Sequence, residues 1–500
     1  MNYMYLKSGT DVRGTALETP EDGPVQLTDD AVADIARAFL VWCERHMDIP
    51  ANQLKLAVGR DSRLSGPRIA AALKEALLPC GVTCYDCGLA STPSMFMAVL
   101  DIPCDCAIQI TASHHPFHRN GLKFFTKDGG LDSPDLTELL SLAEEGSCPG
   151  RSPGGSWQES DHMERYAAHL RELIEKGVNA PDYHRPLSGF HITVDAGNGA
   201  GGFYAEKVLA PLGADISGSR FLEPDGRFPN HIPNPENEEA MGFAARAVTE
   251  SGADLGIIFD TDVDRAGVVD RHGREINRNR LVALASAIAL EDSPGGTVVT
   301  DSITSDGLKE YIEDALGGKH HRFRRGYKNV INEALRLNKE GVDCPLAIET
   351  SGHAALRENY FLDDGAYLVT KIIVKLVKLR REGGELEDML SGLREPAETL
   401  EVRIPILEKD FRARGQELIQ SLEACAIAKG WRIAPDNREG LRVSFPKGEG
   451  QGWFLVRLSV HDPILPVNLE SDAVGGVETI RGKLREFFRE NSLGLDISAL

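Results

Sequence analysis

The chain has 500 residues, of which 42% are hydrophobic and 26% charged, and its 55 basic and 76 acidic side chains give a formal net charge of −21. This length exceeds what one hydrophobic core usually serves, so several domains are expected. The acidic balance argues against nucleic acid or an acidic membrane surface as a partner. No apolar run approaches the roughly 20 residues of a membrane span, and the N-terminal stretch MNYMYLKSGTDVRG lacks the apolar core of a signal peptide. We therefore expect a cytoplasmic protein.

Nine cysteines are present, several of them between residues 80 and 106. Cys84 and Cys106 stand in apolar, strand-like contexts, and no paired C-x-x-C spacing typical of a zinc site occurs. The pattern favours buried, reduced thiols over a metal cluster.

A strand–helix pattern recurs three times along the chain. Each copy opens with a β-rich strand, continues with a helical pattern such as 67–81 or 201–213, and then holds a second apolar strand that ends in polar residues. The opening strands lie in 54–63, 191–202 and 297–305, and the second strands lie in 106–115, 255–265 and 345–353. Strands that alternate with helices predict α/β layers, and ligands bind beyond the carboxyl ends of such strands.

Two stretches rich in Gly, Pro or Ser, 146–156 and 394–399, are typical of linkers, and a softer break lies at 292–296. From about residue 400 the pattern changes to mixed strands (441–445 and 452–460) and a final helix at 474–490. We predict an α/β protein with three similar α/β domains with mixed sheets and a C-terminal α+β domain. The expected boundaries are 1–150, 157–275, 276–394 and 399–500.

The first strand end reads ITASHHPFHRNGLKFF over residues 110–125 and places Ser113 beside His114 and His115. One interpretation is a polar hairpin that turns at Asn120-Gly121, because Asn-Gly is a strong turn signal. The other is a nucleophilic or phosphorylated Ser113. These residues alone leave both open.

The second strand end, DTDVD, places Asp260, Asp262 and Asp264 at alternate positions after an apolar strand. Carboxylates this close repel one another unless a cation holds them, and a ligand set made only of oxygen favours Mg²⁺. An EF-hand is excluded because Arg265 and Arg271 would occupy its sixth and twelfth positions. The alternative is an exposed acidic turn.

The third strand end, ETSGH, offers Glu349, Ser351 and His353, which suit hydroxyl recognition and proton exchange or phosphate contact. In the last segment, Arg457 and Ser459 of RLSVHDP close a strand and suit phosphate binding. Polar turns and satisfied surface residues remain alternatives for each.

Arginines near the N-terminus form a further group. SGTDVRG and VGRDSR supply Arg13, Arg60 and Arg63 on Gly-rich turns. They could neutralise substrate charge, or Arg60 and Asp61 could form an internal ion pair.

The order of these motifs resembles the α-D-phosphohexomutase family, which includes phosphoglucomutases and phosphomannomutases. The resemblance spans about residues 8 to 490, and its motifs are SGTDVRG, VGRDSR, TASHHP…NGLK, DTDVDR, ETSGH and RLSVHDP. It implies four domains around a central cleft, three alike and one different. The Ser113 loop and the three-aspartate loop are its most specific parts.

By resemblance, Ser113 is the phosphoserine, and Asp260, Asp262 and Asp264 hold one Mg²⁺ together with a phosphate oxygen carried by Ser113. Lys123, Arg13 and His114 would lie at the transferring phosphoryl group, with Lys123 as general acid and base if neighbouring cations lower its pKa. The substrate-binding positions implied are Arg265, Lys328, Glu349, Ser351, His353, Arg457 and Ser459.

The chain departs from the family pattern at three places. Ser113-His114-His115-Pro116 stands where the family usually has SHNP, and Thr261 and Val263 replace the glycines of DGDGDR, which reduces backbone freedom. Val460-His461-Asp462 replaces Gly-Thr-Glu in the phosphate loop.

The expected activity is interconversion of hexose 1-phosphate and hexose 6-phosphate, with glucose or mannose as the sugar, through a hexose 1,6-bisphosphate. The partners expected are small sugar phosphates, and the chain would be a monomer or homodimer. One alternative is a non-catalytic sugar-phosphate sensor on the same scaffold, because fold does not guarantee activity. Another is a haloacid-dehalogenase-type phosphatase with Asp260 as nucleophile and Asp363-Asp364 as a later acidic pair.

Overall fold

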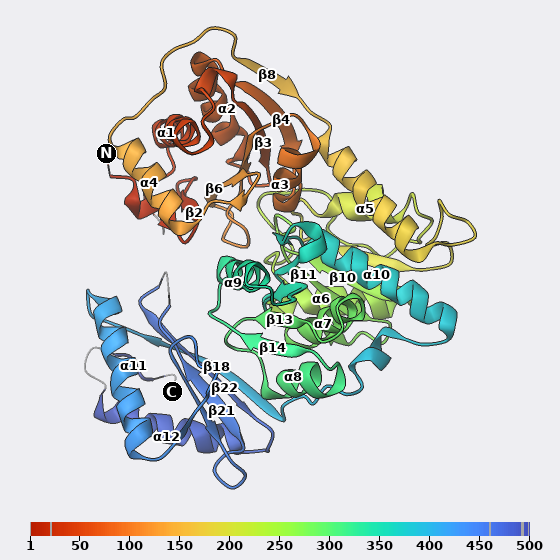
Figure 1. The fold of residues 1–500 in the computed structure, drawn as a ribbon, viewed down its shortest axis with the longest axis vertical. Coiled ribbons are helices and arrows are strands. Elements are labelled where there is room, and N and C mark those ends of the chain that lie inside the picture. The colour runs from red at the N-terminus through yellow and green to blue at the C-terminus, as the bar shows by residue number, and fades with distance from the viewer. Residues whose placement is uncertain (1, 21–22, 460–461, 492–494, 499) are drawn as a thin grey trace. The chain divides into compact units, whose positions relative to one another are not determined.

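The computed structural model describes residues 2–20, 23–459, 462–491, 495–498 and 500. The chain forms two compact units (Figure 1). The first runs up to Leu281 and also takes in Ser351–Ala355 and Leu362–Asp388. The second takes in Val282–Thr350, Leu356–Phe361 and the chain from Met389 onward.

The first sheet is mixed and has eight strands in the order β1-β2-β6-β5-β3-β4-β8, with β7 paired to β6. β3 is parallel to both β4 and β5, whereas β6 runs antiparallel to β5 and β2. β8 pairs with β4 and so belongs to this sheet, although it follows the expected end of the first domain at residue 150. The bounds are β1 (Lys7–Ser8), β2 (Asp11–Thr15), β3 (Lys55–Arg60), β4 (Thr83–Leu89), β5 (Cys106–Ile110), β6 (Arg119–Thr126), β7 (Gly129–Gly130) and β8 (Ser156–Glu159).

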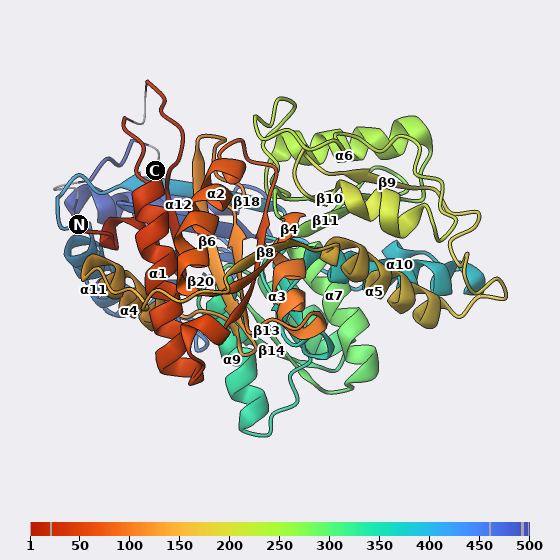
Figure 2. The same ribbon diagram turned by 90° about the horizontal axis from the view of Figure 1, so that it is seen from above.

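Helices cover both faces of this sheet. Alternate side chains of β3, Leu56 and Val58, join the apolar core formed with α1 (Asp29–Met47), α2 (Gly66–Leu77) and α4 (Ser133–Glu144). α3 (Thr92–Asp101) packs on β3, β5 and β6. Figure 2 shows α1, α4 and α3 around the strands of this part of the chain. Successive side chains of a strand point to opposite faces of the sheet, and helices bury both of these faces.

The second sheet has the order β12-β11-β10-β9, with β9 and β10 parallel and the other pairs antiparallel. α6 (Glu238–Ser251) packs on β9 and β10. α5 (His162–Val178) and α10 (Gly365–Glu382) lie side by side (Figures 1 and 2), and the Tyr166 hydroxyl donates to the Asp364 carboxylate at 2.7 Å. The strand bounds are β9 (Ile192–Asp195), β10 (Leu255–Phe259), β11 (Ala266–Asp270) and β12 (Glu275–Ile276).

In the second unit, β14 (Lys319–Arg322), β13 (Thr297–Thr300) and β15 (Leu346–Ile348) are parallel neighbours in that order. α8 (Asp306–Glu310) and α9 (Tyr327–Lys339) belong to the same unit. α7 (Asn279–Asp292), β16 (Ala354–Leu356) and β17 (Leu362–Asp363) lie where the chain passes from one unit to the other.

The C-terminal sheet is antiparallel, in the order β18-β22-β21-β20-β19. Its apolar residues form a separate core with α11 (Phe411–Ala428) and α12 (Gly476–Glu490). The strand bounds are β18 (Glu398–Pro405), β19 (Arg432–Ile433), β20 (Leu441–Phe445), β21 (Gly452–Val456) and β22 (Ile464–Ser471). The expected change of architecture near residue 400 is confirmed.

The hairpin interpretation of Asn120-Gly121 is wrong. Both residues lie inside β6, where Asn120 pairs with Gly14 and Gly121 with Arg13 of β2. The chain reverses earlier, in the segment that follows Ser113. The Asn-Gly dipeptide favours a turn, but the hydrogen bonds that β6 makes with β2 and β5 keep this segment extended.

The structure defines three helical segments more closely. Asp132 is the N-cap of α4, and its amide donates to Asp135 Oδ2 at 2.9 Å in a capping box. Within 201–213, the helix is a π-helix over Tyr204–Leu209. α10 ends at Glu382, where Gly383 takes the left-handed conformation that ends many helices.

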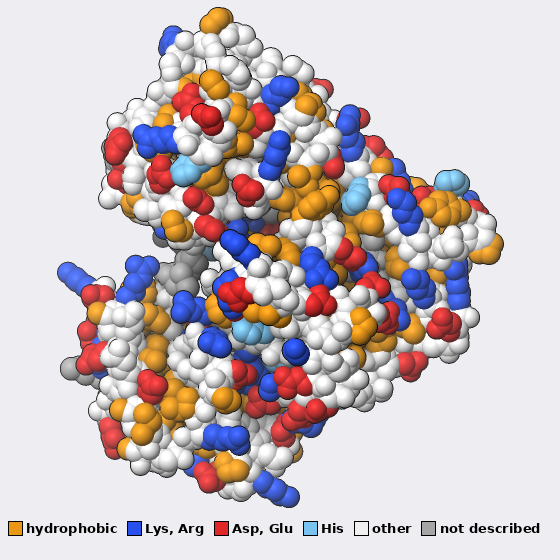
Figure 3. Space-filling view, in the orientation of Figure 1, with side chains coloured by type: hydrophobic (Ala, Val, Ile, Leu, Met, Phe, Trp, Pro, Cys, Tyr) orange, Lys and Arg blue, Asp and Glu red, His pale blue; other side chains and the backbone are white. Residues whose placement is uncertain are grey.

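All nine cysteines are free thiols and seven of them are buried, as the sequence predicts. On the face shown in Figure 3, acidic and basic side chains are interspersed. Across the part of the chain that the structure describes, no helix is both long enough and apolar enough to cross a bilayer.

Candidate functional site

Ser113 occupies a strained turn just beyond β5. Its φ is +50°, a left-handed conformation that costs a residue with a Cβ about 1–2 kcal/mol. The turn is held locally because the Ser113 amide donates to Thr111 Oγ1 at 2.9 Å. The Ser113 hydroxyl donates to Asp260 Oδ2 at 3.1 Å, which brings the first and second strand ends together.

Arg63 binds the backbone of the Ser113 loop. Its guanidinium donates to the backbone carbonyls of Ser113, His115 (2.6 Å), Pro116 (2.7 Å) and Arg119 (2.8 Å). The Arg63 side chain is fully buried, and its Nε lies 3.2 Å from Asp61 Oδ2. The expectation that Arg63 neutralises substrate charge is therefore wrong, because its guanidinium is buried and its hydrogen bonds go to the loop carbonyls and to Asp61, with the Phe228 ring 5.2 Å away. The internal ion pair is Arg63–Asp61 and not Arg60–Asp61.

Asp260, Asp262 and Asp264 follow β10 and are buried. Two glycines let other backbone segments approach this loop. A Cβ on Gly199 would lie 2.5 Å from the Thr261 carbonyl oxygen, and one on Gly365 would lie 2.6 Å from the Arg265 carbonyl carbon. The three carboxylates are thus set by backbone packing on two sides, which excludes the exposed acidic turn.

Two cations partly balance the three carboxylates. Lys123 Nζ lies 2.6 Å from Asp264 Oδ2 and 3.4 Å from Asp262 Oδ2. Arg265 Nη2 lies 3.1 Å from Asp260 Oδ2. The base role of Lys123 was made conditional on neighbouring cations, whereas Asp262 and Asp264 are carboxylate neighbours of its Nζ.

The carboxylates differ in acidity. Burial, together with the charge of Asp264, raises the pKa of Asp260 well above its usual range. Burial would also raise the pKa of Asp264, but the charges of Lys123 and Arg265 outweigh burial and lower it. Three carboxylates share two cations, so a further positive charge would stabilise the ionised cluster.

The residues fit a hard divalent cation. The Asp262 Oδ1 atom is buried and makes no hydrogen bond, and one oxygen from each of the three aspartates lies within 4.8 Å of the others. Buried carboxylate oxygens without partners are costly unless a cation takes them. An all-oxygen set of this kind suits Mg²⁺.

His114 is neutral, with its proton on Nε2. Arg265 Nη2 donates to His114 Nδ1 at 2.6 Å, so that nitrogen must accept. Burial and the charge of Arg265 hold the pKa of His114 well below its ordinary value. The Ser113 hydroxyl oxygen, 3.3 Å from both Arg265 Nη2 and His114 Nδ1, completes this group.

Val263 is the departure from the family pattern with a visible structural cost. Its φ is +67° and its side chain is fully buried. A β-branched residue in this conformation is a genuine outlier. The Val263 carbonyl accepts from the Gly365 amide at 3.1 Å, so packing holds the loop in place.

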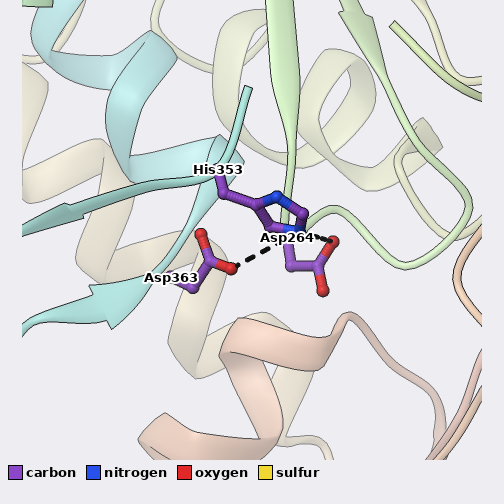
Figure 4. Close-up of side chains that lie close together, drawn as sticks. All are labelled: Asp264, His353 and Asp363. Carbon is purple, nitrogen blue, oxygen red and sulfur yellow. Dashed lines mark ion pairs between the residues drawn. The ribbon is translucent and has the colours of Figure 1, made fainter. Parts of the chain in front are cut away.

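Three other residues expected at the site, Arg13, Ser351 and His353, belong to the first unit. Arg13, on β2, pairs with Asp11 Oδ2 through its Nη2 at 2.8 Å. The Ser351 hydroxyl lies 2.8 Å from His353 Nδ1. His353 Nε2 faces Asp264 and Asp363 (Figure 4).

The remaining expected residues belong to the second unit. The Gly326 amide donates to Glu349 Oε1, and Lys328 is the second residue of α9. Arg457 is largely buried, and burial lowers its pKa; the Asp462 amide donates to Ser459 Oγ at 3.2 Å. Val460 and His461, the other departure in this loop, lie outside the described residues.

Sequence reasoning missed Thr92 and did not find the contacts that Asp61 and Asp363 make here. Thr92 donates its amide to the Asp262 carbonyl at 2.8 Å and its hydroxyl to the Asp262 carboxylate, and no local motif points to it. Asp61 accepts from Thr111 Oγ1 at 2.7 Å, which continues the support of the Ser113 turn. Asp363, noticed only as half of an acidic pair, lies against His353.

Comparison with known proteins agrees with this geometry. Three family models match: phosphoglucomutase/phosphomannomutase alpha/beta/alpha domain I over residues 6–145, domain II over 164–273 and domain III over 277–395. A phosphoglucomutase of Neisseria gonorrhoeae is 30% identical over 482 residues, which is 96% of each chain. The chain belongs to the α-D-phosphohexomutase family. A phosphomannomutase/phosphoglucomutase of Pseudomonas syringae pv. tomato is 30% identical over 447 residues, or 89% of each chain.

Solved structures of phosphohexomutases share the fold. A phosphoglucomutase/phosphomannomutase family protein from Burkholderia thailandensis has a TM-score of 0.80 at 25% identity, with 99% of each chain covered. The open form of phosphoglucomutase (pp63/parafusin) from Paramecium has a TM-score of 0.70 at 14% identity, covering 96% of this chain and 94% of that one, and shows likeness of fold alone. The predicted fold class is confirmed: three α/β domains with mixed sheets are followed by a C-terminal domain with its own sheet.

Proposed function

We propose that this phosphohexomutase interconverts hexose 1-phosphate and hexose 6-phosphate, with glucose or mannose as the sugar, through a phosphorylated Ser113. The observation that carries the proposal is the position of the Ser113 hydroxyl, 3.1 Å from Asp260 Oδ2 and 3.3 Å from Arg265 Nη2. A strained, buried hydroxyl at a carboxylate cluster with an arginine suits a phosphoryl group and has no evident structural use.

Asp260, Asp262 and Asp264, with a phosphate oxygen on Ser113, would hold one Mg²⁺. When bound, the ion neutralises the charge on the transferring phosphoryl group. The three carboxylates and the two cations Lys123 and Arg265 sum to one negative charge, which a divalent ion turns into one positive charge. That excess favours a doubly negative phosphoserine at this place.

The chain's own groups would perform the transfer. A sugar hydroxyl oxygen attacks phosphorus while the bond from phosphorus to Ser113 Oγ breaks; Lys123 Nζ gives a proton to the departing Ser113 Oγ and takes the proton of the sugar hydroxyl in exchange. Arg265 donates to the phosphoryl oxygens, and His114, whose Nδ1 accepts from Arg265, keeps that guanidinium in place. The resulting hexose 1,6-bisphosphate turns over and returns its other phosphate to Ser113, while Lys123 takes the Ser113 hydroxyl proton and gives one to the sugar oxygen that leaves.

The substrate contacts are proposed by family position. Glu349 and Ser351 would recognise sugar hydroxyls, Arg457 and Ser459 would hold the phosphate that does not react, and Lys328 and His353 would contact the sugar phosphate. Arg13 would add positive charge near the transferring group, since its charge is among those that lower the pKa of His114.

The remaining parts of the proposal concern organisation. The four domains are proposed at the expected 1–150, 157–275, 276–394 and 399–500, with the first extended to include β8 up to Glu159, and they are supported by the three family models and the separate C-terminal core. A cytoplasmic location, a monomer or homodimer, and hexose 1,6-bisphosphate as activator belong to the same proposal.

The test is an isomerisation assay with Mg²⁺ and a trace of glucose 1,6-bisphosphate, using glucose 1-phosphate and mannose 1-phosphate as substrates. The wild-type protein should isomerise at least one sugar, and Ser113→Ala should lower the rate at least about a thousandfold. Ser141→Ala, on α4, is the matched control and should keep full activity. Binding of both sugar phosphates without turnover by the wild type would support the sensor alternative.

Peptide mapping after incubation with glucose 1,6-bisphosphate identifies the phosphorylated residue. The proposal requires phosphate on Ser113. Phosphate on Asp260 would support the phosphatase alternative, and it would remove the role assigned to Ser113.

A further inference from the structure

His353 lies between two carboxylates without a hydrogen bond to either of those shown in Figure 4. Its Nε2 is 3.8 Å from Asp264 Oδ1 and 3.6 Å from Asp363 Oδ2. Both distances exceed the range of an N–H···O hydrogen bond. The three side chains are largely buried, at 16%, 2% and 9% exposed for His353, Asp264 and Asp363. A gap of this size between one nitrogen and two oxygens is large enough for a metal ion.

The ring of His353 is oriented for a ligand at Nε2. Its Nδ1 lies 2.8 Å from the Ser351 hydroxyl oxygen. If Nδ1 carries the proton and donates to Ser351, the Nε2 lone pair points toward the two aspartates. Metal-binding histidines almost always donate their second ring nitrogen to an oxygen in this way, which fixes the tautomer.

Asp264 presents its two oxygens to different neighbours. Oδ2 accepts from Lys123 Nζ at 2.6 Å, on the side of the three-aspartate cluster. Oδ1 is buried, makes no hydrogen bond and faces His353 Nε2. An unpartnered carboxylate oxygen that is buried and directed at the gap is the independent sign of a cation there.

The backbone holds these side chains in register. Arg265 and His353 form an isolated β-bridge, and the Ala266 amide donates to the Gly352 carbonyl at 3.4 Å. The Asp364 amide donates to the Ala354 carbonyl at 3.1 Å, which sets Asp363 beside His353. Three short segments therefore present one donor atom each.

The dimensions suit a transition metal. The three donor atoms lie within 4.8 Å of one another. This spacing leaves room for an ion between the three atoms, whose zinc–nitrogen and zinc–oxygen bonds would be about 2.0–2.2 Å long. An imidazole donor favours zinc or cobalt over magnesium, which prefers oxygen alone.

We propose that Asp264 Oδ1, His353 Nε2 and Asp363 Oδ2 form a second metal site, for a divalent transition metal such as Zn²⁺ or Co²⁺, that shares Asp264 with the three-aspartate cluster. The occupied site is inhibitory, because a metal that coordinates His353 and one oxygen of Asp264 makes both groups unavailable to the reaction. This consequence rests on the proposed function, whereas the metal site itself does not.

The experiment is a titration of the full-length protein with Co²⁺ in the presence of excess Mg²⁺, followed by visible absorption and by equilibrium dialysis. One equivalent of Co²⁺ should bind and give the visible bands of an imidazole-ligated ion. Asp363→Asn and His353→Gln should each weaken that binding at least about tenfold. His184→Gln, at an exposed histidine that pairs with Glu175, is the matched control and should bind Co²⁺ as the wild type does.

Two further variants separate this proposal from the proposed function. Ser113→Ala should keep the cobalt bands, so a failure of the mutase assay leaves the metal test intact. Asp260→Asn should weaken the magnesium site and spare the cobalt bands. Circular dichroism confirms that each variant is folded. The proposal is overturned if Co²⁺ fails to bind in excess Mg²⁺, or if its binding is unchanged in both folded Asp363→Asn and His353→Gln.

Discussion

At the scale of single residues, Arg63 determines the shape of the Ser113 loop. It is fully buried, donates to four carbonyls of that loop and pairs with Asp61. The planar fork of a guanidinium can reach several acceptors at once, which a lysine ammonium cannot do with the same geometry. The Ser113 turn is therefore maintained by a residue fifty positions away in the sequence.

Arg63→Met should lower the free energy of unfolding by about 3–5 kcal/mol, because it leaves Asp61 as an uncompensated buried charge and the loop carbonyls without donors. Arg63→Lys should cost less, because it keeps the charge. Urea unfolding measures both. Arg60→Met, at the partly exposed end of β3, is the control and should cost less than about 1 kcal/mol. Equal costs for the variants at positions 60 and 63 would refute this role.

Val263 carries backbone strain that glycine would remove. Val263→Gly should therefore cost about 1–2 kcal/mol less in unfolding free energy than Val268→Gly. Both valines are fully buried, but Val268 lies in the regular strand β11. Urea unfolding of the two variants side by side gives the difference. If the two substitutions cost the same, the φ of +67° at Val263 stores no strain.

At the scale of elements, the proposed catalytic residues follow the ends of strands, whereas buried residues within the strands affect stability. Glu470, the second-last residue of β22, is a buried acidic residue opposite Trp453 of β21. Trp453 Nε1 donates to its carboxyl at 3.1 Å. Burial raises the pKa of Glu470 to about 7, although Arg442 acts to lower it.

This raised pKa makes the C-terminal domain less stable as pH rises. Below the unfolded pKa of about 4.5, both states are protonated and stability is complete. Between 4.5 and 7 only the unfolded state releases the proton, so stability falls by a total on the order of 3 kcal/mol. Glu470→Gln should therefore match the wild type in Tm at pH 5 and exceed it at pH 8.

Calorimetric scans at the two pH values measure the change. Glu401→Gln, on the partly exposed face of β18, is the control and should show no such pH-dependent gain. A Glu470→Gln variant that tracks the wild type at both pH values would mean that Glu470 ionises normally.

At the scale of the whole molecule, the net charge of −21 makes a local excess of carboxylates costly, and a bound cation relieves it. The Asp260–Asp262–Asp264 cluster is the place where this matters most, because its carboxylates are buried. Cation binding and global stability are therefore linked.

Mg²⁺ at a hundred times its dissociation constant should stabilise the wild type by about 2.7 kcal/mol, seen as a rise in Tm. Asp262→Asn should lose that rise. Without metal the same variant should be more stable than the wild type, because it removes one repelling charge from the cluster. Glu145→Gln, an exposed acidic residue, is the control and should keep the full response to Mg²⁺. A magnesium-dependent rise that survives in Asp262→Asn would place the ion elsewhere.

The local sequence determined the strand ends, the order of the motifs and the candidate residues Ser113, Asp260, Asp262 and Asp264. A strand is recognisable from a few consecutive apolar residues, and the polar residues directly after it can be read in the same window. β20 was predicted residue for residue for this reason. The change to a different C-terminal architecture was equally local.

Tertiary structure alone decided which of these groups meet. The Arg63 brace, the neutral His114, the carboxylate partners of Lys123 and the approach of Asp363 to His353 all join residues that are distant in the sequence. It also overruled the turn signal at Asn120-Gly121, because β6 pairs with strands on both sides. The side-chain pattern of a segment specifies which functional groups it contains. The packing of segments against one another sets the distances between these groups and the charges around them, and these determine their pKa values and reactivity.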